Sequence, residues 1–384
     1  MEEIHYAYWL STLDGIGTYT VRNLLEYAGS YSEIWQLNEA ELKKACPKLQ
    51  SEPAQLIISS RNEIQIMASY EEMLSRGIRF LHPMHPDYPP GLKYINNPPT
   101  GIYVMGDLPD PEVLSIAIIG ARACSEYGRY VTRKLSGALS RAGVQIISGM
   151  ALGVDGIAQK AALDAGGYTC GVLGCGVDIC YPEDNRYIYN GLISSGGLIS
   201  EYHPGTGPIS GQFPLRNRII SALSDIVVVI EARDRSGSLI TADLALEQGK
   251  DVYALPGRVT DSLSHGCNRL IRQGAGIILS PEEFIKDIAA DYIHGSRKVT
   301  PPGSALTGTD KNNAGAVQMT LTGAYGLSDD ENSIMKIMDY SPKTVKTLQE
   351  ESGIEPGRLY SCLMTLTMKG LIVQKGSRYA RCSD

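Results

Sequence analysis

An arginine inside the first glycine turn of a strand–helix pattern is the most informative position of this chain. The apolar run at residues 116–119 ends at Gly120, and Arg122 follows before a segment that reads as a helix. A strand, a tight turn and a helix N-terminus form the phosphate site of Rossmann-type folds. The later glycines of the dinucleotide motif G-x-G-x-x-G are missing, so the turn predicts a phosphate site that is not built for a dinucleotide.

Further loops after predicted strands carry glycines, hydroxyl side chains and guanidinium groups. Free N–H groups at a helix start bind oxyanions, and arginine suits planar contacts to phosphate and stacking on bases. Beyond Arg122, the candidate site residues are Ser125, Ser148, Gly149, Gly153, Phe213, Arg216, Asn217, Arg218, Ser236, Gly237, Ser238 and Thr241. Several such loops in a row suit either a chain of phosphates or one multiply phosphorylated ligand.

Catalytic and metal-binding signatures are missing from the sequence. It contains no G-K-[ST] P-loop, no H-E-x-x-H, no G-x-S-x-G and no C-x-x-C pair. Four acidic residues are possible catalytic groups, but no positioned acid–base pair stands out, and each reads first as a helix cap or as a partner of a loop arginine: Asp155, Asp178, Glu231 and Asp243. We therefore expect no cofactor, no metal and no enzymatic activity.

Alternating apolar strands and amphipathic helices must position these loops. Strands are predicted at residues 115–119, 144–147, 168–173, 198–200, 225–231, 251–255 and 276–279, with helices such as 154–165 and 239–248 between them. This alternation predicts an α/β fold with a mostly parallel sheet covered on both faces. Ligands of such sheets bind beyond the carboxyl ends of the strands, where the candidate residues follow.

Two regions precede this predicted sheet. Residues 1–80 read as short helices, and the run Leu13-Asp14-Gly15-Ile16-Gly17 looks like the turn of a helix–hairpin–helix. Such a turn either presents N–H groups to a DNA phosphate or simply joins two helices of a bundle. Residues 81–111 are rich in proline, which cannot donate a backbone hydrogen bond, so we predict an extended connector there.

Two regions follow the predicted sheet domain, which we place at residues 112–289. Residues 290–325 are rich in Gly, Pro, Ser, Thr and Asn and predict a flexible linker. Residues 326–384 predict a winged helix: helix 328–338, helix 342–351 after an N-cap at Ser341, helix 355–369, and a hairpin around Gly376. The balanced charge of this module suits either a protein contact or a weak DNA contact.

Charge is unevenly distributed along the chain. The net charge is −7, and residues 1–110 account for most of it with 14 acidic and 8 basic side chains. Residues 112–290 contain 12 arginines against 4 lysines, so an anionic ligand is expected there. No signal peptide and no apolar run of membrane-spanning length is evident, and the cysteine pattern suits reduced thiols, so we expect a cytoplasmic protein without membrane contact.

Several motifs together resemble one known family, the bacterial DNA-processing protein A family (DprA/Smf). The matching runs are Gly120-x-Arg122-x-x-Ser125-x-Tyr127-Gly128, Ser148-Gly149-x-Ala151-x-Gly153-x-Asp155, Gly174-x-Gly176-x-Asp178-x-x-Tyr181-Pro182-x-x-Asn185, Phe213-Pro214-x-Arg216-Asn217-Arg218, Ser236-Gly237-Ser238-x-x-Thr241-Ala242, and Pro256-Gly257 with Gly266-x-Asn268. They occur in order and cover essentially all of residues 80–285. The N- and C-terminal regions also fit the longer members.

The resemblance implies a non-enzymatic protein that binds single-stranded DNA, protects incoming DNA and loads the RecA recombinase during natural transformation or recombination. It also implies an extended Rossmann-like domain that forms a homodimer, between a sterile-alpha-motif-like N-terminal domain and a winged helix. Arg122 would clamp a phosphate, Phe213 would stack on a base, and Arg216 and Arg218 with Asn217 would hold adjacent phosphates or sugars. Gly149, Ser236, Ser238 and Thr241 would supply further donors.

One position departs from the family pattern. Many members have a lysine three residues before the Phe-Pro pair, and Ser210 stands there in this chain. The competing hypotheses are a nucleoside-monophosphate phosphoribohydrolase-like enzyme on the same Rossmann variant, and a domain that binds a small nucleotide signal. The enzyme would need a P-G-G-x-G-T-x-x-E loop, and the nearest stretch, residues 236–241, has no glutamate at the catalytic place.

Overall fold

The computed structural model describes residues 1–292, 327–339, 342–375 and 378–382. The chain forms two compact units, one built on a large sheet together with the helical N-terminal region, and one built on the C-terminal module. The expected linker at 290–325 lies outside the described residues from residue 293 onward. In the part of the chain that is described, no helix combines the length and apolarity needed to cross a membrane.

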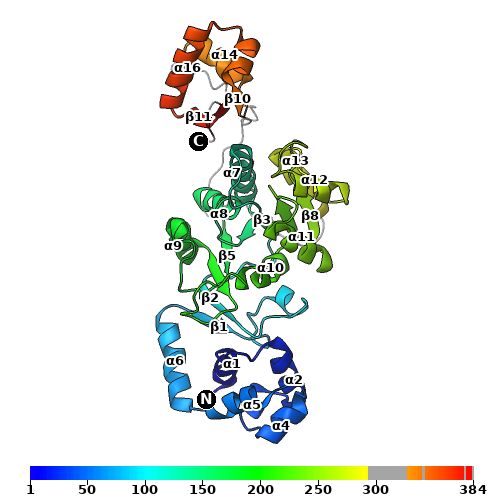
Figure 1. The fold of residues 1–384 in the computed structure, drawn as a ribbon. Coiled ribbons are helices and arrows are strands. Elements are labelled where there is room, and N and C mark those ends of the chain that lie inside the picture. The colour runs from blue at the N-terminus through cyan, green and yellow to red at the C-terminus, as the bar shows by residue number, and fades with distance from the viewer. Residues whose placement is uncertain (293–326, 340–341, 376–377, 383–384) are drawn as a thin grey trace, which may run out of the picture. The chain divides into compact units, whose positions relative to one another are not determined.

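Six short helices form the N-terminal region (Figure 1). They are α1 (Glu3–Ser11), α2 (Thr18–Ala28), α3 (Tyr31–Ile34), α4 (Glu39–Ala45), α5 (Ser51–Ser59) and α6 (Glu63–Ser75). Side-chain capping fixes the start of several of these helices. At the start of α4, the side chain of Asn38 accepts the backbone N–H of Glu41, and the side chain of Glu41 accepts the backbone N–H of Asn38. Trp9, Leu24 and Ile57 are buried between the helices. The predicted hairpin between α1 and α2 is present, with Gly15 at φ 79° in its turn.

Nine strands form the central sheet. They are β1 (Arg79–Leu81), β2 (Ile102–Gly106), β3 (Ser115–Ile119), β4 (Gln145–Ser148), β5 (Thr169–Leu173), β6 (Gly197–Ser200), β7 (Ile226–Val229), β8 (Asp251–Ala254) and β9 (Gly276–Ile277), in the spatial order β1-β2-β6-β5-β4-β3-β7-β8-β9. All pairs from β6 to β9 are parallel, whereas β1–β2 and β2–β6 are antiparallel. The predicted α/β fold with a mostly parallel sheet is confirmed.

Helices cover the sheet on both faces, as predicted. They are α7 (Glu126–Arg141), α8 (Val154–Asp164), α9 (Arg186–Ser195), α10 (Gln212–Ala222), α11 (Gly237–Glu247), α12 (His265–Arg272) and α13 (Pro281–Tyr292), with short 3-10 turns at Pro90–Leu92 and Glu183–Asn185. Figure 1 shows α8 and α9 on one side of the sheet and α10 and α11 on the other. Buried side chains of α10, α11 and α12 form one core with β3, β5 and β7.

The prediction of a plain connector at residues 81–111 is wrong in part. β2 lies within it and joins the sheet between β1 and β6. The prolines that suggested a connector fall between residues 83 and 99, whereas residues 102–106 contain none and can donate every ladder hydrogen bond. The sheet therefore begins at residue 79, well before the predicted domain boundary at residue 112.

The C-terminal unit has the predicted helix order with one shifted boundary. Its elements are α14 (Asp329–Ile337), β10 (Lys343–Thr344), α15 (Val345–Ser352), α16 (Pro356–Met368), β11 (Ile372–Lys375) and β12 (Arg378–Arg381), with sheet order β10-β12-β11. α15 starts at Val345, not at residue 342, because residues 343–344 pair with β12. Thr344 caps this helix by accepting the N–H of Thr347, and Ser341 lies outside the described residues.

Candidate functional site

A cavity opens where the chain order of the sheet reverses. β3 and β7 are neighbours, and the chain proceeds from β3 to one side of the sheet and from β7 to the other. Crevices form at such switch points, beyond the carboxyl ends of the strands. A cavity of about 620 Å³ lies here, lined by the loops after β3, β4, β5, β6 and β7 and by the first turns of α10 and α11. The fold therefore brings separate loops of the sequence to one place.

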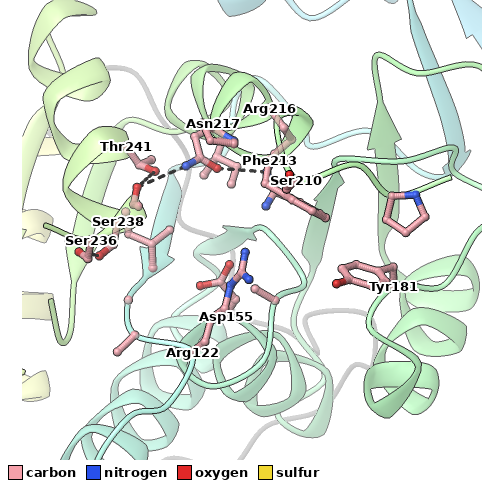
Figure 2. A pocket seen from close by; sticks show the side chains of 18 residues that line it. Arg122, Asp155, Tyr181, Ser210, Phe213, Arg216, Asn217, Ser236, Ser238 and Thr241 are labelled. Atoms are coloured by element: carbon pink, nitrogen blue, oxygen red, sulfur yellow. Dashed lines mark hydrogen bonds between the residues drawn. The ribbon is translucent and has the colours of Figure 1, made fainter. Parts of the chain in front are cut away.

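Most predicted site residues line this cavity. They are Arg122, Phe213, Arg216, Asn217, Ser236, Gly237, Ser238 and Thr241. Figure 2 shows Tyr181 on one side of the cavity and Ser236 and Ser238 on the opposite side, with Arg122 and Phe213 between them. Ser210, the position that departs from the family pattern, also lines the cavity.

Arg122 is the exposed cation of the site. It lies in the short loop after β3, and its guanidinium carbon lies 5.7 Å from the centre of the Phe213 ring. Within the described residues no carboxylate lies within ion-pair distance of Arg122. Its charge is therefore available to an anion that enters the cavity.

Arg216 lines the cavity but is buried, with 5% of its surface exposed. Its Nη1 donates to the carbonyl oxygens of Gly149 (2.8 Å) and Val172, and its Nε donates to Oδ1 of Asn217 (3.2 Å). Burial lowers the pKa of Arg216 to about 10, and the nearby Asp155 carboxylate opposes this shift. Arg216 remains charged at neutral pH, and its hydrogen bonds join α10 to the ends of β4 and β5.

Of the described residues that line the cavity, Asp155 is the one with a carboxylate side chain. It is buried and accepts the N–H of Gly149 at 3.1 Å. Burial raises its pKa, while Arg216 and the backbone N–H groups of Gly149, Ala151 and Gly120 lower it. These contacts tie the loops after β3 and β4 together beneath the cavity. The sequence-based expectation of a helix cap or of a loop-arginine partner is not met in this form, because the side chain accepts a backbone N–H of its own loop and the nearby Arg216 lies in α10.

Arg218 lies away from the cavity, contrary to the expectation that it neighbours Arg216 on the ligand. Its Nη2 pairs with Oε1 of Glu201 at 2.6 Å, and 7% of its side chain is exposed. Its Nε donates to the carbonyl oxygen of Asn97 (2.8 Å) and its Nη1 to that of Leu215 (2.9 Å). Two residues along a helix lie about 200° apart, so Arg216 and Arg218 cannot share a face. Arg218 holds α10 against the residue 89–99 segment.

Four other predicted residues are not among the residues that line the cavity and have structural contacts of their own. Ser125 accepts the N–H of Gly128 and so caps α7. The buried Ser148 hydroxyl donates to the Ile118 carbonyl at 2.7 Å, linking β4 to β3. Neither Gly149 nor Gly153 leaves room for a Cβ. A Cβ added at Gly149 would lie 2.6 Å from Nη2 of Arg216, and a Cβ added at Gly153 would lie 2.3 Å from the Arg122 carbonyl oxygen. The two glycines therefore let Arg216 and the loop that carries Arg122 pack closely.

The first turn of α11 forms the polar side of the cavity. Ser236 precedes the helix, and its hydroxyl lies 2.7 Å from that of Ser238. Nδ2 of Asn217 and Oγ1 of Thr241 both donate to the Gly237 carbonyl at 3.4 Å. No acidic residue lies in this first turn, so its free N–H groups and the helix dipole favour an anion.

Tyr181 is a cavity residue that the sequence reasoning did not select. It follows β5 and stacks on Phe213, with 5.5 Å between ring centres and 26° between ring planes. Its signal in the sequence was an aromatic residue in a loop at the carboxyl end of a predicted strand. Asp178 and Pro182 interrupt any helix start in this loop, so the glycine motif there gives only a weak dinucleotide signal.

Comparisons with known proteins assign the family. The family model "DNA recombination-mediator protein A" matches residues 79–289, and the model "DprA winged helix domain" matches residues 322–376. Protein Smf of Synechocystis is 33% identical over 99% of this chain and 100% of its own length. DNA processing protein DprA of Bacillus subtilis is 35% identical over 66% of this chain and 88% of its own length.

Two solved structures are similar to the chain. DprA from Streptococcus pneumoniae shares 30% identity with a TM-score of 0.66, covering 75% of this chain and 99% of the other. DprA from Helicobacter pylori, described for its single-stranded DNA binding mode, shares 34% identity with a TM-score of 0.50, covering 56% and 97%. The family match starts at residue 79, where β1 begins. The chain belongs to the DNA recombination-mediator protein A family of DNA-processing proteins, known as DprA or Smf.

Proposed function

We propose that the cavity at the β3–β7 switch point binds single-stranded DNA without catalysing a reaction. The observation that carries the proposal is the combination of the exposed Arg122, the aromatic Phe213 and the acid-free first turn of α11 on one cavity. An exposed cation and helix N–H groups bind phosphates, and an aromatic ring binds any base by stacking. The similar H. pylori protein, described as binding single-stranded DNA, supports this ligand.

Fluorescence anisotropy tests the proposal. A labelled single-stranded oligonucleotide and a duplex of equal length are titrated with the protein at several salt concentrations. We expect tighter binding of the single strand, with an affinity that falls as salt rises because bound cations are released from the phosphates. Equal affinity for both, or no binding of either, contradicts the proposal.

The same assay distinguishes a single strand from the alternative ligand, a small nucleotide. If the cavity holds one nucleotide, a mononucleotide displaces the labelled strand at comparable concentration. If it also hydrolyses nucleoside monophosphates, incubation releases free base. For a strand-binding site, long oligonucleotides compete and mononucleotides do not, because several phosphate contacts are needed for affinity.

The wider biological role rests on family membership. We propose that the bound protein protects incoming DNA and loads RecA onto it, acts as a homodimer through the Rossmann-like domain, and resides in the cytoplasm. RecA loading predicts that the protein speeds RecA filament formation on single strands covered by a single-strand-binding protein. An unchanged filament formation rate contradicts this part, and sedimentation equilibrium tests the dimer.

A further inference from the structure

The aromatic surface of the cavity belongs to two rings that the sequence keeps far apart. Phe213 lies in the first turn of α10, and Tyr181 lies in the loop between β5 and α9. The rings stack with 5.5 Å between centres and 26° between planes. Figure 2 shows the Tyr181 ring directed into the cavity beside Phe213. A base that enters the cavity therefore meets an aromatic pair.

Phe213 is already contacted on several sides. The Arg122 guanidinium lies 5.7 Å from its ring centre, and Tyr181 stacks on it. Its ring also rests on Gly174, where an added Cβ would lie 2.8 Å from the Phe213 ring. Phe213 is consequently half-buried, whereas 43% of Tyr181 is exposed. The aromatic area that is open to a base is therefore largely that of Tyr181.

The loop that carries Tyr181 is anchored at two residues that precede the ring, Val177 and Asp178. Both oxygens of Asp178 accept the N–H of Gly205, at 2.9 and 3.1 Å, and Asp178 also pairs with Arg76 of the N-terminal region. The Tyr189 hydroxyl donates to the Val177 carbonyl at 2.6 Å. A ring that is held in place before binding loses little conformational entropy when a base stacks on it.

We propose that Tyr181 is the residue on which an unpaired base stacks, and that Phe213 supports it from behind while Arg122 holds the adjacent phosphate. The inference rests on the proposed function, because it names the group that receives the base of the single strand. Stacking on a ring does not distinguish bases, so this contact adds affinity without sequence preference.

A graded series of substitutions at Tyr181 tests the proposal in the full-length protein. We expect Tyr181→Leu to weaken oligo-dT binding about tenfold, Tyr181→Phe to retain it, and Tyr181→Trp to strengthen it, because stacking scales with ring area. The dependence of affinity on salt should be the same for all four proteins, since stacking releases no counterion. Equal affinities across the series overturn the proposal, and so does a loss in Tyr181→Phe as large as that in Tyr181→Leu, which shows that the hydroxyl and not the ring makes the contact.

Photocrosslinking provides a readout that does not depend on affinity. Oligonucleotides containing 5-iododeoxyuridine are irradiated with the wild-type protein, and the attached peptide is identified by mass spectrometry. We expect the label on Tyr181; a label on Phe213 without Tyr181 overturns the inference but leaves the proposed function standing. If the wild-type protein binds no single strand, the proposed function fails, and this inference fails with it.

Discussion

At the scale of single residues, three arginines of one predicted site have three different environments. Arg122 is exposed beside Phe213, Arg216 is buried under the carbonyls of Gly149 and Val172, and Arg218 is paired with Glu201. A guanidinium group donates hydrogen bonds either to protein carbonyls or to an incoming phosphate, and its burial determines which of these acceptors it can reach. Of these three, Arg122 is the one that is both exposed and part of the cavity lining.

Replacing Arg122 with alanine should weaken single-strand binding about tenfold, a loss of about 1.4 kcal/mol. The slope of log affinity against log salt should also become shallower by about 0.7, as for one lost contact to a single-stranded phosphate. Anisotropy titrations at four salt concentrations measure both changes. Arg22→Ala is the matched control, because Arg22 is exposed on α2 and paired with Glu26. A loss of affinity without a change of slope would show that Arg122 does not contact a phosphate.

Ser210→Lys should have the opposite effect. Ser210 is exposed and lines the cavity, so a lysine there adds one cation within reach of the strand. We expect tighter binding at low salt and a slope steeper by about 0.7. The uncharged variant Ser210→Gln controls for side-chain length, and a lysine variant with the wild-type slope would contradict the prediction.

At the scale of elements, a glycine at the start of α8 sets the position of the loop that carries Arg122. Gly153 has φ 76° and ψ −128°, and a Cβ there would lie 2.3 Å from the carbonyl oxygens of Ala121 and Arg122. The N–H of Val154 also donates to the Ala121 carbonyl. The loop after β3 and the start of α8 therefore form one tightly packed unit.

Gly153→Ala should lower both stability and affinity for the single strand. The substitution adds backbone strain and pushes against the Arg122 loop, so we expect a loss of about 3 kcal/mol in the free energy of unfolding and a binding loss of about tenfold. Urea unfolding and anisotropy measure the two effects. Binding that stays at the wild-type level in the folded variant would contradict the coupling.

Gly166→Ala is the matched control for this prediction. Gly166 follows the other end of α8 with a similar φ of 72°, but no atom lies within 4 Å of an added Cβ. This variant should lose about 1 kcal/mol from the positive φ alone and should bind the single strand as the wild-type protein does. A binding loss in this variant would show that stability, and not the position of Arg122, determines affinity.

At the scale of the sheet-containing unit, the helical N-terminal region and the sheet share one core. Tyr8 of α1 packs edge-on against Phe80 of β1 and Tyr103 of β2. Thr18 donates to the Pro98 carbonyl at 2.7 Å. His82 follows β1 and packs edge-on against Tyr31 of the helical region, with 6% of its surface exposed. Stability of this junction therefore depends on the protonation of a buried histidine.

Acid should weaken the junction through His82. Burial and, to a smaller extent, the neighbouring His85 lower the pKa of His82 from 6.5 to about 4, and Glu3 opposes this shift. The unfolded chain therefore binds more protons between pH 6.5 and 4, so the free energy of unfolding falls as the pH drops through this window. We expect this group to contribute about 2 kcal/mol of the loss.

Urea unfolding at pH 7 and pH 4.5 measures this contribution. His82→Gln should reduce the difference between the two free energies of unfolding, because glutamine does not titrate. His265→Gln, at an exposed position of the sheet unit, should leave the difference in place. Parallel pH profiles of His82→Gln and the wild-type protein would show that His82 does not cause the effect.

Much of the fold follows from patterns that are local in the sequence. Apolar runs and their spacing placed the strands from β3 to β9 within about two residues and predicted the covered parallel sheet. The motifs after these strands indicated the family, and the loops after β3 and β7 meet because parallel strands end at the same edge. The proline content of residues 81–111 gave a wrong prediction at β2, where five residues without proline join the sheet between β1 and β6.

The environment of each candidate side chain was decided by the tertiary structure alone. Arg216 and Arg218 look equivalent in the sequence, yet packing gives each a different set of protein acceptors. Tyr181 stacks on Phe213, which is 32 positions away in the sequence, and the Asp178–Gly205 hydrogen bond joins the loops after β5 and β6 beside this contact. The propensity of a segment to form a helix or a strand depends on neighbours along the chain, so the sequence predicted these elements. The burial of a side chain and its hydrogen-bond partners depend on segments that the fold brings together. The sequence alone could therefore not predict the environments of these side chains.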